Sequence, residues 1–234
     1  MDGVAAAPTL ATPPVMATPV LLVVHGRSGG VIPTELQTLA SELAQRRGTP
    51  VLLQALTAAC PDVLPPSLAQ AAGVGGQTLT LVPLMLLPGG HVRQDIPALA
   101  KHWCALPGVG AVRRLPFVGA WPRWQQALAA EAAQLRTAAL VRSPRPELLH
   151  HPLEGALARR FLEHLAQITD TDLRATPYSS EHLADLQLTL SAPALPLALA
   201  ANRLTDSLAS LVGPPLLQRP RFRQLLLDAL EALP

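Results

Sequence analysis

The chain has 234 residues, of which 49% are apolar and only 15% charged, a balance that excludes a disordered protein. Eighteen basic and 16 acidic side chains leave a formal net charge of +2, and aromatic residues make up only 3%. A nucleic-acid-binding protein is not expected, because it needs a concentrated basic surface or rings on which bases stack.

Cysteine usage and hydropathy indicate a cytoplasmic protein without a membrane partner. The only cysteines, Cys60 and Cys104, form neither a CxxC motif nor a disulfide framework. No apolar run approaches the roughly 20 residues that a membrane-spanning helix needs. Residues 1–19 lack the basic and apolar regions of a signal peptide, so we expect a disordered Ala/Pro/Thr-rich tail there.

Short apolar runs alternate with amphipathic segments along the first half of the chain. Val20–Val24 (VLLVV) predicts a buried parallel strand, because every position is apolar. Apolar residues three and four apart predict a helix over Thr34–Arg47, with Gly48 as its stop. Further strands are expected at Pro50–Leu56, Gln77–Leu87 and Ala111–Leu115, and further helices at Pro65–Ala72, Asp95–Cys104 and Trp121–Thr137. This alternation predicts an open parallel α/β sheet.

The second half of the chain repeats the first. PLMLLPGGHVRQDIPAL, from Pro83, matches PLALAANRLTDSLASL, from Pro196, which begins 113 positions later. Upstream, AALVRSPRP echoes LLVVHGRSG, which places Arg142 near the His25 position, and a helix over 155–167 is expected to follow. The repeat predicts an α/β fold of two similar lobes, 20–137 and 138–234, each a small parallel sheet flanked by helices.

The segment Gly26–Gly30 (GRSGG) has the G-x-S-x-G spacing of a hydrolase nucleophile elbow. In that elbow the serine follows several strands and leads at once into a helix. Here Ser28 follows the first strand, and Val31-Ile32-Pro33 separates it from the next helix. A serine hydrolase is therefore the least favoured hypothesis.

Two of the seven histidines follow predicted strands. His25 ends the first strand and His91 comes just after the third, where parallel sheets bind their ligands. Both adjoin glycines, which let the backbone approach a bulky ligand closely. Imidazole exchanges protons near neutral pH and binds Co, Fe, Ni or Zn. The alternative is a pair of ordinary loop histidines, and the other five are expected in packing or on the surface.

The strand LVPLMLL followed by PGGHVRQDIP resembles the signature of the class II sirohydrochlorin chelatases, which insert cobalt or iron during cobalamin and sirohaem synthesis. VVHGRSGG resembles their first-strand motif, and the last forty residues resemble the second copy in the long, duplicated members. The resemblance implies a two-lobed, ATP-independent metal chelatase with a cleft between the lobes. It implies that His25 and His91 are the catalytic residues, which hold the metal and assist deprotonation of the tetrapyrrole.

The substrate of that family carries eight carboxylates, so the resemblance implies a basic rim. Arg27 and Arg93 beside the histidines are the first candidates for substrate binding, and Arg113 and Arg114 are the second. The remaining candidates for contact with substrate are Ser28, Gly89 and Gly90. Asp95 is interpreted as the N-cap of the following helix rather than as a metal ligand.

The sequence also departs from the family pattern. Ser and Arg are transposed in HGRSGG, and Thr57 stands where family members often carry an acidic residue. These departures motivate a second hypothesis, a non-catalytic protein that binds tetrapyrrole or metal. We expect one active site, in the first lobe, and a monomer. No tightly bound cofactor is expected, since Co²⁺ or Fe²⁺ would be a substrate.

Overall fold

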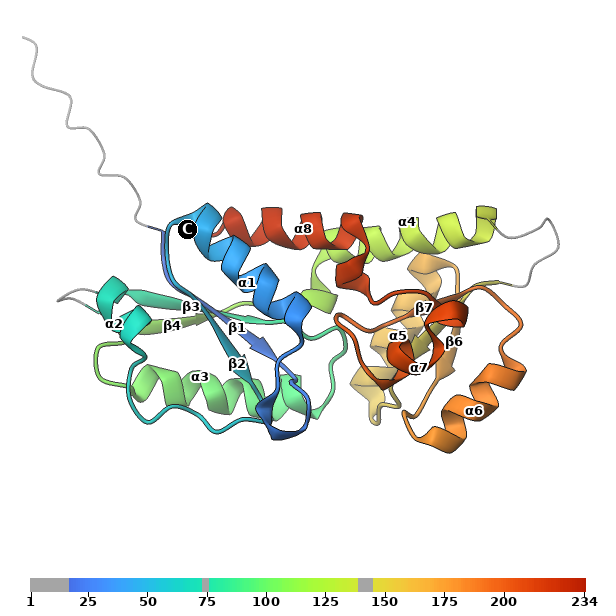
Figure 1. Ribbon diagram of the computed structural model, residues 1–234, viewed down its shortest axis with the longest axis horizontal. Coiled ribbons are helices and arrows are strands. Elements are labelled where there is room, and N and C mark those ends of the chain that lie inside the picture. The colour runs from blue at the N-terminus through green and yellow to red at the C-terminus, as the bar shows by residue number, and fades with distance from the viewer. Residues whose placement is uncertain (1–16, 73–75, 139–144) are drawn as a thin grey trace, which may run out of the picture.

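The computed structural model describes residues 17–72, 76–138 and 145–234, which form two parallel sheets flanked by helices (Figure 1). The first sheet has the order β2-β1-β3-β4 and the second the order β6-β5-β7. The strands are β1 (Val20–Val24), β2 (Val51–Ala55), β3 (Thr78–Pro83), β4 (Ala111–Arg114), β5 (Glu147–His150), β6 (Asp172–Ala175) and β7 (Ala194–Pro196). Every pairing is parallel, so the predicted α/β architecture is confirmed.

The helices are α1 (Thr34–Arg47), α2 (Pro66–Ala72), α3 (Ile96–Ala105), α4 (Pro122–Ala138), α5 (Ala156–Thr169), α6 (Ser180–Thr189), α7 (Arg203–Val212) and α8 (Pro220–Glu231). Helix α1 has the predicted bounds, and Gly48 closes it in the left-handed conformation. Within the described ranges, no helix combines the length and the apolar composition that crossing a membrane requires.

Strand β3 is shorter than predicted. It ends at Pro83 rather than Leu87, because no neighbouring strand pairs with it beyond that residue: the pairing with β4 ends at Leu81 and the pairing with β1 at Pro83. The residues that follow, Leu84 to Leu86, are nevertheless buried, which explains why the apolar run continues past the strand.

Alternate residues of β1 face two different cores. Leu22 belongs to a cluster with side chains of α1, α4 and α8. Leu21 packs on the other face, against α3, where Trp103 is almost fully buried. Covering both faces explains why every position of this strand is apolar.

Two helices cross between the sheets. Helix α4 follows the first sheet but packs against α5 of the second, and α8 returns to pack against α1 and α4 (Figure 1). The Trp124 and Phe222 rings, from α4 and α8, lie 5.1 Å apart in one cluster that also includes Leu148 and Leu195 of the second sheet. The two sheets therefore share a continuous hydrophobic core.

The two ends of the described chain lie together. The Thr18 hydroxyl donates to the Pro234 carbonyl at 2.6 Å. The Arg47 guanidinium donates to the carbonyls of Thr18, Leu230 and Leu233 and thus joins α1 to α8 and to the segments just before β1 and just after α8. Of the predicted 1–19 tail, residues 1–16 lie outside the described residues. The predicted lobe boundary at 137/138 stays a prediction.

The register of the sheets aligns the two halves of the chain. In the first sheet Leu84 N–H donates to Val23 O at 2.8 Å, and in the second Leu197 N–H donates to Leu149 O at the same distance. The β7 segment thus follows its β3 counterpart by 113 positions, the predicted offset. The β5 strand follows β1 by 126 positions.

With this offset, His151 stands at the position of His25. Each residue directly follows a strand that lies between two parallel neighbours, β1 between β2 and β3 and β5 between β6 and β7. The sequence alignment had placed Arg142 there. Residues 139–144 of that segment lie outside the described residues, and the central strand of the second sheet begins later, at Glu147.

Candidate functional site

The structure brings His25 and His91 together at the carboxyl end of the first sheet. His25 directly follows β1, and His91 lies in the connection from β3 to α3. Because β1 and β3 are neighbours, the two rings meet edge to face, with centroids 4.8 Å apart and an interplanar angle of 76°. The His25 side chain is exposed and the His91 side chain half-exposed, so a ligand can reach both.

The loop that carries His25 is fixed against β2. Gly26 has φ +78°, and a Cβ there would lie 2.6 Å from both Ala55 Cβ and Thr57 Oγ1, so only glycine fits. The Thr57 hydroxyl donates to the Arg27 carbonyl at 2.8 Å. His25 Nδ1 donates to the Gly26 carbonyl at 2.7 Å, which leaves Nε2 with its lone pair.

Asp95 orients His91. Residues His91–Asp95 form a single π-helical turn, in which Ile96 N–H donates to the His91 carbonyl. The His91 Nδ1 donates to the Asp95 carboxylate at 2.5 Å, so Nε2 again carries the free lone pair. A second group that accepts the Nδ1–H of a ligand histidine fixes both its tautomer and its ring orientation.

The prediction that Asp95 caps α3 was wrong. Its side chain makes no capping hydrogen bond, and its backbone is already helical, at φ −73° and ψ −40°. An N-cap residue needs an extended backbone to direct its side chain at the first free N–H groups. Because the π turn runs directly into α3, Asp95 has no such role and is available to His91.

The two arginines beside the histidines both approach the second lobe. Arg27 donates to the carbonyl of Ala201, in the connection from β7 to α7, at 3.0 Å. It also forms an ion pair at 3.1 Å with Asp206 of α7. The Arg93 guanidinium lies 4.0 Å from where a Cβ of Gly155 would stand, just before α5. Both side chains are thus at the junction of the lobes.

Arg113 and Arg114 lie elsewhere. Arg113 pairs with Thr80 in the sheet and donates to its hydroxyl at 3.2 Å. Thr80 in turn pairs with Val20, the first residue of β1, whereas His25 follows the last. At about 3.3 Å per residue, the two arginines lie near the far end of the strands and do not contribute to this site.

The remaining residues predicted to contact substrate, Ser28, Gly89 and Gly90, lie at the surface or at the lobe junction. Ser28 begins an exposed single turn, and no described histidine forms a hydrogen bond with it, which gives no support to a hydrolase. A Cβ at Gly89 would lie 3.3 Å from Leu153 of the second lobe. A Cβ at Gly90 would meet nothing within 4 Å.

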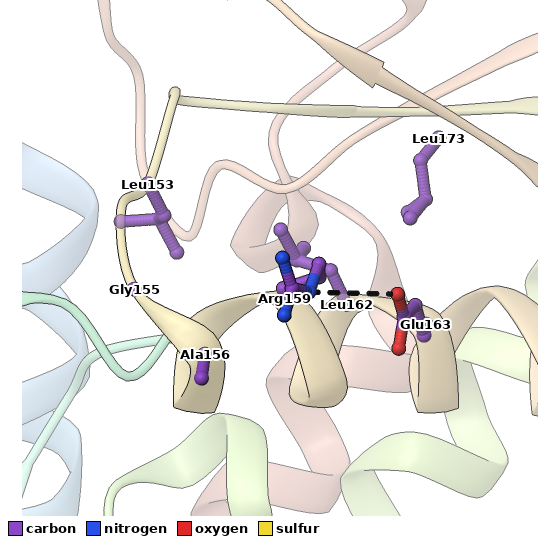
Figure 2. A pocket seen from close by; sticks show the side chains of 7 residues that line it. All are labelled: Leu153, Gly155, Ala156, Arg159, Leu162, Glu163 and Leu173. Carbon is purple, nitrogen blue, oxygen red and sulfur yellow. Dashed lines mark ion pairs between the residues drawn. The ribbon is translucent and has the colours of Figure 1, made fainter.

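A surface pocket of about 400 Å³ borders this junction on the side of the second lobe. Figure 2 shows its lining by α5, β6 and the loop before α5, with an Arg159–Glu163 ion pair along α5 at 4.0 Å. Neither His25 nor His91 lines this pocket. It is therefore distinct from the histidine pair.

The donor set is open. Among the described residues, no group of three or more His, Cys, Asp or Glu side chains is placed to enclose a metal ion. Two imidazole ligands alone are typical of a site that holds a metal ion weakly and releases it, and not of a structural metal site.

Sequence reasoning missed one further imidazole. His151, read as a surface residue, occupies the quasi-equivalent position to His25. The sequence feature that could have identified it is the strand Glu147–His150 directly before it. This strand is short and begins with a charged residue, so its apolar pattern is weak.

Comparison with known proteins gives a consistent result. A family model described as CbiX matches residues 19–135. A search of curated protein sequences finds no match.

Three solved structures share the fold. SirB from Bacillus subtilis with Fe³⁺ is 15% identical, with 91% of this chain and 94% of that chain covered and a TM-score of 0.58. CbiX, described as the terminal enzyme for biosynthesis of siroheme in denitrifying bacteria, is 21% identical, with 91% and 98% covered and a TM-score of 0.57.

The third is a multi-domain protein from Deinococcus radiodurans, described as structurally similar to chelatases. It is 19% identical, with 92% of this chain covered and a TM-score of 0.52. The chain spans only 55% of the length of that protein, which has two additional domains. At these identities the three structures show a common fold.

Proposed function

The chain belongs to the CbiX family of chelatases, and we propose that it inserts a divalent metal, Co²⁺ or Fe²⁺, into sirohydrochlorin without ATP. The observation that carries the proposal is the juxtaposition of His25 and His91, each with its Nδ1 occupied and its Nε2 free. One solved relative is described as an enzyme of siroheme biosynthesis and another as SirB with Fe³⁺, which supports a tetrapyrrole substrate and iron as a metal.

The two imidazoles suit the metal-loading step. Nitrogen ligands lie about 2.1 Å from a bound transition metal, so two that share one ion must be within about 4 Å of each other. Rings with centroids 4.8 Å apart can place their Nε2 atoms in that range. The incomplete donor set favours transfer of the ion to the four nitrogens of the tetrapyrrole, which hold it far more firmly.

The insertion step must remove two protons. Two pyrrole N–H bonds break, four nitrogen–metal bonds form, and both protons pass to bases and then to water. The protein can accelerate this exchange by holding the ring and the ion in register and by accepting the protons.

The arginines at the lobe junction suit a polycarboxylate. Arg93 forms no ion pair among the described residues, so its guanidinium is available to a substrate carboxylate. Arg27 already has a carboxylate partner in Asp206, which a substrate carboxylate would replace. Ser28, Gly89 and Gly90 are proposed to complete the contacts with substrate.

An anaerobic absorbance assay tests the proposal. Sirohydrochlorin is mixed with Co²⁺ or Fe²⁺ and the wild type, His25→Ala, His91→Ala or the control His164→Ala, in which an exposed histidine of α5 is removed. We expect metallation above the spontaneous rate with wild type and control, and its loss in both site variants. Wild-type rates in the site variants would contradict the site, and no metallation by wild type would contradict the function.

A second candidate, a carrier that binds without turnover, is favoured by Thr57. Its hydroxyl is used to hold the His25 loop, and no carboxylate replaces the acidic residue that family members often carry there. In the same assay, a spectral shift on adding sirohydrochlorin to wild type without faster metallation would identify the carrier.

A further inference from the structure

The second lobe presents an imidazole in the same setting as His25. Each histidine follows an inner strand of its sheet, and the last residue of that strand accepts a hydrogen bond from the residue just after a neighbouring strand. Leu56 N–H donates to Val24 O in the first sheet, and Thr176 N–H donates to His150 O in the second. The two positions are thus equivalent in backbone pairing as well as in sequence order.

The anchoring of the ring is also the same. His151 Nδ1 donates to the carbonyl of the next residue, Pro152, at 3.0 Å, as His25 Nδ1 does to Gly26. The His151 ring meets an aromatic ring edge to face, that of Tyr178, with centroids 5.2 Å apart and an interplanar angle of 76°. Its Nε2 is therefore also free, and the side chain is exposed.

The two titratable side chains next to His151, those of His150 and Tyr178, are less open to a ligand. His150 is buried at the end of β5, and burial lowers the pKa of its imidazole, so it stays neutral. Burial raises the pKa of the Tyr178 hydroxyl, which therefore keeps its proton near neutral pH. His151 is the member of this group with an exposed ring and an Nε2 that is open to a ligand.

The loop that begins with His151 packs against the β3–α3 connection of the first lobe, which carries His91. Leu153, two residues on, contacts Gly89, and Gly155 lies beside the Arg93 guanidinium. On the other side of the junction, Arg27 of the His25 loop contacts Ala201 and Asp206. The loops at the carboxyl ends of both sheets thus meet, and each set carries an imidazole with a free Nε2.

The proposed reaction needs a proton acceptor besides the two histidines that hold the metal. His25 and His91 each have one nitrogen lone pair, and a nitrogen bound to a metal cannot accept a proton at the same time. Thr57 supplies no carboxylate in their place. Resting on the proposed function, we propose that His151 accepts pyrrole protons from the second lobe while His25 and His91 hold the metal.

The step balances without a further reactant. A pyrrole N–H bond breaks, its electron pair forms the nitrogen–metal bond, and the proton binds His151 Nε2 to give an imidazolium. Because the side chain is exposed, this imidazolium returns its proton to water before the second N–H is broken.

The test separates metal binding from proton transfer. His151→Gln and His151→Ala are compared with wild type and with His164→Gln, after thermal melting shows that all four are folded. Anaerobic Co²⁺ titration, followed by the visible absorption of the ion, measures metal affinity. Absorbance of sirohydrochlorin measures the metallation rate, with and without added imidazole.

We expect the His151 variants to bind Co²⁺ as wild type does and to metallate about 100-fold more slowly. Added imidazole should restore part of the rate of His151→Ala and leave wild type and His164→Gln unchanged. Wild-type rates in the His151 variants, or loss of Co²⁺ affinity that accounts for the slower rate, would overturn the inference. Inactive wild type would instead refute the proposed function.

Discussion

At the scale of single residues, the histidine pair shows what sequence position can reveal. His25 and His91 are 66 positions apart, yet their adjacency follows from placing each after a strand of a parallel sheet. The Asp95 contact was not predictable in this way. A capping rule uses only the local sequence, and it cannot anticipate the π turn that removes the cap position.

Asp95→Asn should impair the metal binding that we propose for His91, without affecting the fold. The amide can donate to Nδ1, which favours the tautomer with its proton on Nε2 and removes the lone pair directed at the metal. We expect metal affinity and metallation rate to fall about 10- to 100-fold. Co²⁺ titration measures this loss, and Asp185→Asn, an exposed change on α6, is the matched control. Unchanged affinity would mean that Asp95 does not position His91.

Gly26→Ala should be among the most damaging single-methyl changes. The left-handed backbone and the two contacts at 2.6 Å both oppose a Cβ, so we expect a loss of about 2 kcal/mol or more in the free energy of unfolding. Gly90→Ala adds the same methyl in open space on a helical backbone and should leave stability unchanged or slightly raised. Urea denaturation compares the two; equal stabilities would contradict the argument.

At the scale of elements, prediction succeeded where one face of a segment is buried. Helix α1 and strand β1 have the predicted bounds because their apolar spacing reflects a single buried face or complete burial. Strand β6 was not predicted, since three of its four residues are exposed at the edge of the sheet. The docking of α8 on α1 could not be predicted either, because it joins segments nearly 180 residues apart.

Glu42 of α1 should show how charge contributes to this docking. It pairs with Arg223 of α8 and with Arg46, and these guanidinium groups, Arg223 first, lower the pKa of its carboxyl. A lowered pKa stabilises the fold above the unfolded value near 4.5, and the contribution is lost as pH falls through the folded value.

We therefore expect Glu42→Gln to cost a few tenths to about 1 kcal/mol at pH 7, with the difference from wild type vanishing in acid. Urea midpoints at pH 7 and at steps down to pH 2 measure it. Glu163→Gln, at an exposed position of α5, is the control because its ion pair lies within one helix. A difference that is still complete at pH 2 would assign the effect to packing rather than charge.

At the scale of the whole molecule, the shared core makes the two sheets interdependent. Two lobes could be inferred from the sequence repeat. The packing of α4 against the second lobe and of α8 against the first could not, because the apolar spacing of each helix would equally fit packing on its own lobe. Contacts such as Trp124 with Phe222 arise only from this packing.

Phe222→Ala should therefore weaken the entire fold by about 3–5 kcal/mol. Of the three tryptophans, Trp103 lies in the core between the first sheet and α3, and Trp124 lies in the shared core. Their fluorescence therefore reports the first lobe and the shared core, whereas circular dichroism reports the helices and strands of both lobes. We expect the two signals to coincide in urea for wild type and variant alike. Separate transitions would show that the lobes unfold independently.

The hydrogen bond between Thr18 and Pro234 has a consequence for chain connectivity. Since the ends of the fold touch and Arg47 binds both, a circular permutant that joins Pro234 to Thr18 through a short linker can retain the described contacts. New termini would fall between residues 138 and 145, after α4 and before β5. The order of synthesis would then be reversed, with His151 made before His25, while the same surfaces meet.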